Sequence, residues 1–327
     1  MKSHRLVLLS IVALIAMCLC LAAPARAVEG HFVRTLQVSG ALELDVQTGS
    51  GTIDVRTGDS SSVHVTGTIR ANGGWFDSAS AEEKVHYLET NPPIEQHGNI
   101  IKIGHVEDPD LTRNISISYE IVAPVETRLR SSSGSGEENV SGLRGPVEVS
   151  SGSGNLKLTN IGDTVRASTG SGHISLEGVK GAVHASTGSG EILANGVAGG
   201  LHASTGSGSV TLRQTAPGDV EVNAGSGTLR LEGVHGAVRA QTASGNILVE
   251  GEGQDSWRLS TASGSVTVRL PAQQGFTLHA HTVSGSIHTA RDMTVHGTFD
   301  KHELEGKVGD GGFALEVSTV SGNIRVE

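Results

Sequence analysis

A motif of about 18 residues recurs along most of the chain and constrains its fold more than any other feature. Residues 165–176 read Val-Arg-Ala-Ser-Thr-Gly-Ser-Gly-His-Ile-Ser-Leu, and nearly the same sequence returns at residues 183–192 and 201–210. On both sides of the Gly-Ser-Gly turn, apolar and polar residues alternate, which predicts two short strands with one buried and one exposed face. A unit repeated at a fixed period is typical of architectures whose copies stack on one another.

The second glycine of each turn marks the copies. After residue 129 it recurs every 18 to 21 residues until a last gap of 37, which we interpret as holding a degenerate copy over residues 289–312. The second glycine never changes, whereas the first is replaced in four copies. We therefore expect the second glycine to need a positive φ or to have no room for a Cβ atom. The second glycines are Gly51, Gly136, Gly154, Gly172, Gly190, Gly208, Gly227, Gly245, Gly264, Gly285 and Gly322, and the replacements of the first are Ala243, Ala262, Val283 and Val320.

Positions aligned on the second glycine indicate which side chains face inward. Seven residues before it stands an apolar residue, five before it mostly Ala, and three before it a small residue, usually Thr. Two residues after it stands Leu, Ile or Val, with Glu138 as the exception. Stacking would bring equivalent residues into contact and pair each strand with the copies above and below. The predicted fold is therefore all-β, a β-solenoid of rungs of about 18 residues. A flexible Gly/Ser linker is the weaker alternative because the period is strict.

The first residues, 1–27, have the pattern of a secretory signal peptide. A basic start and an apolar run lead to an Ala-x-Ala sequence that ends at Ala27. Both cysteines lie in this segment, so the cleaved chain would hold no disulfide and no thiol. Loss of Lys2, Arg5 and Arg26 would change the formal net charge from −10 to −13, which disfavours nucleic acid and anionic membranes as partners. We expect export to the periplasm, cell surface or exterior, with no transmembrane segment after cleavage.

The rest of the chain divides into two regions. Residues 28–128 contain irregular strand patterns, the first rung and a cap-like insertion. Within the insertion, a capping sequence predicts one short helix at about residues 81–90, which the following Asn-Pro-Pro sequence would end. Residues 129–327 form the regular solenoid array.

The recurring Gly-Ser-Gly turns indicate structure and not catalysis. A phosphate-binding loop needs a helix after it, and here a strand follows each turn. The turns offer no carboxylate ladder for calcium, and no serine lies in a nucleophile elbow. Asp108 and Asp110 are close in sequence but lie in a predicted turn. We expect no catalytic residue and no cofactor. The enzyme alternative, a polysaccharide-active β-helix, would need carboxylates clustered in one groove.

Two groups of residues are candidates for contact with a ligand. Trp75, Phe76 and Tyr87 concentrate in the irregular segment, where they either anchor a sugar or protein or form the small core of a cap. The second group lies in an outward row of the array, which also holds Glu221. Its members are Arg166, His184, His202, Arg239 and Arg258.

Histidines raise the question of a metal site. His184 and His202 occupy the same position in adjacent rungs and would stack, while His279, His281 and His288 are expected to form a second cluster near the end. Imidazoles can bind zinc or copper. The mixed charges around them are typical of a solvated face, so we expect no metal site.

The repeated Ser-Thr-Gly-Ser-Gly-x-Ile-x-Leu-x-Gly-Val sequence, preceded by Ile-Ser-Tyr-Glu-Ile-Val-Ala-Pro at residues 117–124, resembles the bacterial "putative adhesin" family. These are exported β-helical proteins with a domain of unknown function, and the likeness covers residue 32 to the end. The resemblance implies a non-enzymatic protein of the cell envelope and supplies no catalytic residues. We expect a binding or scaffold protein that presents flat, hydroxyl-rich faces to glycan or protein. A purely structural envelope component that associates end to end is a further alternative.

Overall fold

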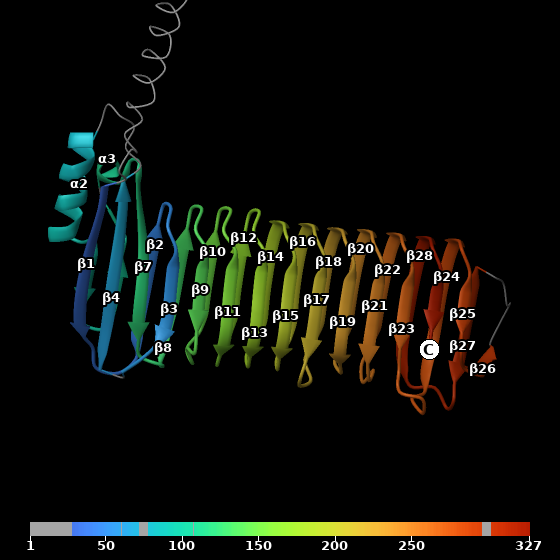
Figure 1. Cartoon of the computed structure of the whole chain (residues 1–327). Helices are drawn as coiled ribbons and strands as arrows, with labels where there is room; N and C mark the ends of the chain where they lie inside the picture. The colour runs from blue at the N-terminus through green and yellow to red at the C-terminus, as the bar shows by residue number, and fades with distance from the viewer. Residues whose placement is uncertain (1–27, 60, 72–77, 107, 296–301) are drawn as a thin grey trace, which may run out of the picture.

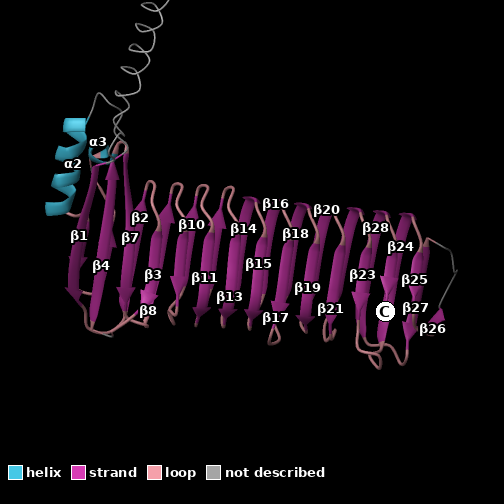
Figure 2. Ribbon diagram, viewed as in Figure 1, coloured by secondary structure: helices cyan, strands magenta, loops and turns pink. Residues whose placement is uncertain are grey.

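The computed structural model describes residues 28–59, 61–71, 78–106, 108–295 and 302–327. The predicted signal peptide, Trp75 and Phe76 lie outside these residues. The described chain forms a rod built from two long sheets, one of 14 strands (sheet A) and one of 15 strands (sheet B). Strands lie side by side along the whole rod, and helix occurs near one end (Figure 2).

Each rung of the array contributes one strand to each sheet. Neighbouring rungs pair parallel and in register, so that Val147, Val165 and Val183 lie opposite one another. This confirms the predicted β-solenoid. The sheet B strands are β8 (Thr127–Ser133), β10 (Val147–Ser151), β12 (Val165–Thr169), β14 (Val183–Ser189), β16 (Leu201–Ser207), β18 (Val220–Ser226), β20 (Val238–Ser244) and β22 (Trp257–Ser263). The sheet A strands are β9 (Glu138–Ser141), β11 (Leu156–Ile161), β13 (Ile174–Val179), β15 (Ile192–Val197), β17 (Val210–Gln214), β19 (Leu229–Val234), β21 (Ile247–Gly251) and β23 (Val266–Arg269).

The second glycine of each turn lies against the turn of the neighbouring rung. A Cβ atom on Gly172 would overlap the backbone carbonyl oxygen of Gly154. The hydroxyl of Thr169 donates to the same carbonyl oxygen at 3.0 Å, and its Oγ1 accepts from the amide of Gly172 at 3.1 Å. Close approach of the backbones therefore excludes any side chain, as predicted, and the buried threonine satisfies the polar groups of the turn. Equivalent hydroxyls donate to the turn of a neighbouring rung from Ser151, Thr187, Thr205, Thr261, Thr282 and Thr319.

Glu138 is the one carboxyl among the apolar residues that fill its position in the other rungs. Its residue is 0% exposed, and its Oε2 accepts a hydrogen bond from the hydroxyl of Ser131 on the facing sheet. No group of the described chain donates to its Oε1. Burial raises the pKa of Glu138 to about 7, which the hydrogen bonds from Ser131 and from the backbone of Ser133 partly oppose.

Antiparallel strands and a helix extend the rod at its N-terminal end. The helix α2 (Ser78–Thr90) packs against β1 and β4 and buries Ala81, Val85 and Leu88. The predicted helix is confirmed, and it begins three residues earlier than expected (Figure 1). The division at residue 128 stays a prediction. The other elements of this end are β1 (Val28–Gln37), β2 (Leu42–Thr48), β3 (Ile53–Thr57), β4 (Ser62–Ala71), β5 (Ile94–His97), β6 (Ile100–Ile103), α3 (Pro109–Thr112) and β7 (Ile115–Ala123).

At the C-terminal end the last rung of the sequence is not the last rung in space. The rung of β28 (Phe313–Ser321) and β29 (Ile324–Val326) lies between the β22–β23 rung and the rung of β24 (Phe276–Ser284) and β25 (Ile287–Thr289). After forming the outer rung of β24 and β25, the chain therefore returns to an inner position, where β28 pairs in parallel with β22 on one side and with β24 on the other.

The predicted degenerate rung over residues 289–312 is wrong. After β25, the described residues of this stretch form β26 (Met293–Val295) and β27 (Glu303–Val308), which both join sheet B. Strand β27 runs antiparallel to β24, and β26 antiparallel to β27, so these strands extend one sheet instead of forming a rung. The alternation of apolar residues was visible in the sequence, but alternation does not encode the direction of a strand.

Candidate binding face

The outward face of sheet B, called face B below, carries two straight rows of polar side chains. They stand six and four residues before the second glycine of each turn. Since the rungs pair in register, each row continues from strand to strand. In spatial order the charged row is Arg130, Glu148, Arg166, His184, His202, Glu221, Arg239, Arg258, Glu316 and His279. The hydroxyl row is Ser132, Ser150, Ser168, Ser186, Ser204, Asn223, Gln241, Ser260, Ser318 and His281.

All five predicted contact residues of the array lie in the charged row. Arg166, His184 and His202 follow one another on β12, β14 and β16, and Arg239 and Arg258 are neighbours on β20 and β22. The rings of His184 and His202 stack with centroids 5.9 Å apart and planes inclined by 36°. The structure thus brings the five together in one line, while their contact with a ligand stays a prediction.

Ion pairs neutralise part of the charged row. Arg130 lies 3.2 Å from Glu148, His202 lies 3.3 Å from Glu221, and Arg258 lies 2.9 Å from Glu316. The hydrogen bond from the Arg258 guanidinium lowers the pKa of Glu316, so this carboxylate keeps its charge. Exposed ion pairs of this kind contribute little to stability, so folding does not depend on the charged side chains of this row.

Two hollows follow one another along the charged row as far as Arg258. One of about 420 Å³ runs past His184, His202, Arg239 and Arg258, and the small residues Ala182, Gly200, Ala237 and Ser256 also line it. Another of about 130 Å³ begins on the adjacent strand at Arg166 and runs in the opposite direction. A third, of about 650 Å³, lies over the middle of the hydroxyl row. Face B therefore offers long shallow depressions along the rod.

A stripe of small apolar side chains marks the turn edge of face B at the C-terminal end. The first glycine of the turn is replaced on four rungs that are consecutive in space, because the last rung is inserted. Their order is Ala243, Ala262, Val320 and Val283. Val320 and Val283 are 54% and 60% exposed. The sequence showed the replacements but not their adjacency, since rung order in space differs from order in the chain.

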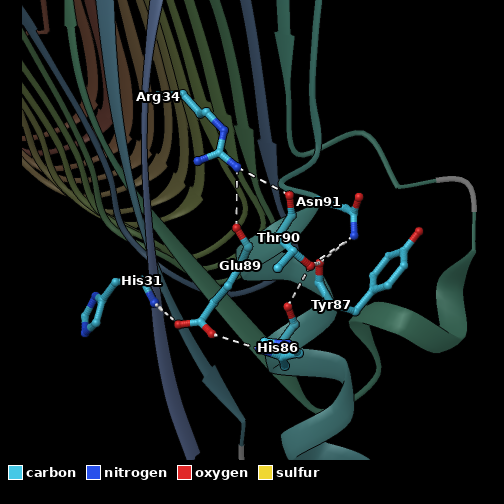
Figure 3. Close-up of polar contacts among 7 residues, drawn as sticks. All are labelled: His31, Arg34, His86, Tyr87, Glu89, Thr90 and Asn91. Atoms are coloured by element: carbon cyan, nitrogen blue, oxygen red, sulfur yellow. Dashed lines mark hydrogen bonds and ion pairs between the residues drawn. The ribbon is translucent and has the colours of Figure 1, made fainter.

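The aromatic candidates of the insertion are only partly described. Tyr87 lies on α2, is 49% exposed, and projects its ring away from the rod (Figure 3). It is therefore not part of the buried core under α2, which is the role that a cap would have given it. The helix is held instead by Arg34, which donates to the carbonyls of Glu89 and Thr90, and by the Glu89 carboxylate, which accepts from the amide of His31 at 2.8 Å (Figure 3).

The prediction of a second histidine cluster is wrong for His288. His279 and His281 lie on β24 in sheet B, but His288 lies on β25 in sheet A. The turn between the two strands carries them to different sheets, as it does in every rung. In the part of the chain that the structure describes, no three His, Cys, Asp or Glu side chains are grouped so as to hold a metal ion. No helix of this part is long and apolar enough to cross a membrane.

Comparison with known proteins places the chain in a family. A family model described as Toastrack DUF4097 matches residues 41–327. The chain belongs to the Toastrack DUF4097 family. Its match spans the first complete rung, the insertion and the whole array, so all of the features of face B lie inside the Toastrack region. No curated protein matches the chain.

Three solved structures show weaker likenesses. A putative cell adhesion protein from Clostridium sporogenes is 12% identical, with 92% of this chain and 99% of that chain covered and a TM-score of 0.21. A putative adhesin from Bacteroides fragilis is 11% identical, with 91% and 97% covered and a TM-score of 0.29. A putative lipid binding protein from Parabacteroides distasonis is 11% identical, with 91% and 97% covered and a TM-score of 0.36. These values are too low to transfer a ligand to the present Toastrack chain.

Proposed function

We propose that this Toastrack protein is an exported, non-enzymatic binding or scaffold protein of the bacterial cell envelope, of the adhesin type. Face B is the surface that would contact glycan or protein. The observation that carries the proposal is the unbroken register of the two polar rows from β8 to β24. The signal-peptide pattern of residues 1–27 supports export to the periplasm, the cell surface or the exterior.

The repeat geometry suits an extended partner. Equivalent positions stand about 4.8 Å apart along the rod, so the ten rungs offer polar side chains at regular intervals to one extended ligand. Many weak contacts made by one extended ligand add up to useful affinity, although each of them is small. A hydroxyl both donates and accepts, and a row of hydroxyls can therefore bind the hydroxyl groups of a sugar chain or the backbone of a protein.

A pull-down tests the proposal. The purified protein is immobilised and exposed to cell-wall polysaccharide and to envelope extracts. Retention of a glycan or protein that the double variant Ser186→Trp/Ser204→Trp no longer retains is the expected result, because both side chains stand in the middle of the hydroxyl row. Ser175→Trp on the outward face of sheet A is the matched control. Retention of nothing, or equal loss with the control, would contradict the role of face B.

One observation favours an enzyme as the second candidate. A groove of about 560 Å³ near the C-terminal end of face B is lined by three carboxylates, Glu303, Glu305 and Glu316. Clustered carboxylates are what cleavage of a polysaccharide would need. Glu316 is in an ion pair with Arg258, and the Glu305 carboxylate lies 3.6 Å from the ring of His279. Hydrolysis of any glycan in a broad panel, abolished by Glu303→Gln, would establish this candidate, and inactivity throughout the panel would end it.

A further inference from the structure

Positive charge is left without a partner along the central part of face B. Arg166 and Arg239 make no hydrogen bond and no ion pair in the described chain, and His184 contacts only the ring of His202. Of the neighbouring carboxylates of the row, Glu148 is paired with Arg130, and Glu221 lies 3.3 Å from the ring of His202. The chain as a whole carries a formal net charge of −10, whereas the row from Arg166 to Arg239 holds two arginines and one carboxylate, Glu221. Asp219 also lines the hollow beside this row.

The spacing of these groups indicates an extended ligand. Arg166 and Arg239 are separated by four rung intervals, which corresponds to about 19 Å along the rod. A single small anion cannot contact both. The hollow of about 420 Å³ runs from His184 past Arg239, and Ala182 and Gly200 on its lining leave room for a chain to approach the backbone.

The neighbouring hydroxyl row indicates what the ligand carries besides anionic groups. Ser168, Ser186 and Ser204 stand beside the charged row on the same strands, two residues further along each strand. Hydroxyls at this spacing can bind sugar hydroxyl groups. Neither row contains Trp, Tyr or Phe, the large rings on which nucleotide bases commonly stack, which disfavours single-stranded nucleic acid.

We propose that face B binds an acidic polysaccharide, whose chain lies along the rod with its oxyanion groups at Arg166, His184 and Arg239 and its hydroxyl groups at the serines. This inference rests on the proposed function and names its ligand class. The binding is electrostatic and exposed, so it weakens as salt rises. It also strengthens with the length of the polysaccharide, until the chain spans the charged stretch.

Titration calorimetry with the full protein tests the ligand class. The probes are polygalacturonate, heparin and a phosphomannan, which carry carboxylate, sulfate and phosphate, and methyl-esterified galacturonan is the neutral match to the first. We expect at least one polyanion to bind, with an affinity that falls with added salt and exceeds that of its monomer. Equal binding of galacturonan before and after esterification overturns the proposal, and so does failure of all three polyanions.

Variants locate the site. Arg166→Ala/Arg239→Ala is expected to weaken binding about tenfold, since each exposed charge contributes about three- to fivefold. Arg213→Ala removes an exposed arginine from sheet A and should leave binding unchanged. Equal effects of the two variants overturn the proposal. Retention of a neutral glycan or an envelope protein by face B, without polyanion binding, overturns the inference but leaves the proposed function standing. Retention of nothing overturns both.

Discussion

The buried carboxyl of Glu138 makes the stability of the first regular rung depend on pH. The pKa of this group is raised from an ordinary value of 4.5 to about 7, chiefly by burial. Below about pH 4.5 the carboxyl is protonated in both the folded and the unfolded chain. Between the two pKa values the folded chain keeps a proton that the unfolded chain has lost, so the free energy of unfolding falls as pH rises. Since a tenfold change in an equilibrium corresponds to about 1.4 kcal/mol, the loss amounts to about 3 kcal/mol by neutral pH and does not grow further at higher pH.

The expected result is a difference between Glu138→Gln and the original protein that depends on pH. Glutamine keeps the size and polarity of the side chain but does not titrate, so the variant should lose the fall in stability of about 3 kcal/mol. Glu138→Leu combined with Ser131→Ala should go further and stabilise the rung at about pH 8, because equivalent positions of the next rungs hold leucine and alanine or valine. An engaged but exposed acid, Glu148→Gln, is the control.

Amide hydrogen exchange of β8 and β9 is the suitable assay, because stacked rungs can open locally without global unfolding. Urea unfolding followed by circular dichroism, at intervals from about pH 4 to pH 8, gives the global counterpart. Parallel pH profiles for the original protein and Glu138→Gln would refute the reasoning. So would direct observation by NMR of a Glu138 carboxyl that titrates at an ordinary value.

Three further predictions concern the stacking of the rungs. Gly172→Ala should cost about 1–3 kcal/mol because the new Cβ overlaps the carbonyl of Gly154 in the preceding turn. A Cβ on Gly170 approaches the carbonyl of Gly152 less closely, and other rungs hold alanine at this position, so Gly170→Ala should cost less, as urea unfolding will show. Thr187→Val removes a buried hydroxyl that donates to the preceding turn at 3.0 Å and should cost about 1–2 kcal/mol in the same assay. Arg291→Ala should raise amide hydrogen exchange in the rung of β28 and β29, because the Arg291 guanidinium donates to the carbonyl of Glu327 and to three carbonyls of the loop between β23 and β24. Arg325→Ala removes an exposed arginine and should leave this exchange unchanged.

Sequence reasoning was sufficient for the rung and insufficient for the ends of the rod. The second glycine and the threonine three residues before it recur because every rung meets its neighbour in the same way, so their constraint is visible as repetition. The ends carry no such repetition. Residues 276–289 and 313–326 have the same pattern, and either would fit next to β22 and β23. In the observed order, Arg291 binds the carbonyls of Leu270, Pro271 and Glu327 and so ties the loop after β23 to the end of β29.

The candidate site shows the same division between what repeats and what does not. The outward row was predictable because alternation fixes which side chains face solvent. The pairing of Arg258 was not, because it depends on the order of rungs in space. Arg258 pairs with Glu316, which is 58 residues away, only because the last rung is inserted beside β22. Arg166 and Arg239 make no ion pair in the described chain, since the neighbouring carboxylates Glu148 and Glu221 lie beside Arg130 and His202. The unpaired arginines therefore stand in the middle of face B.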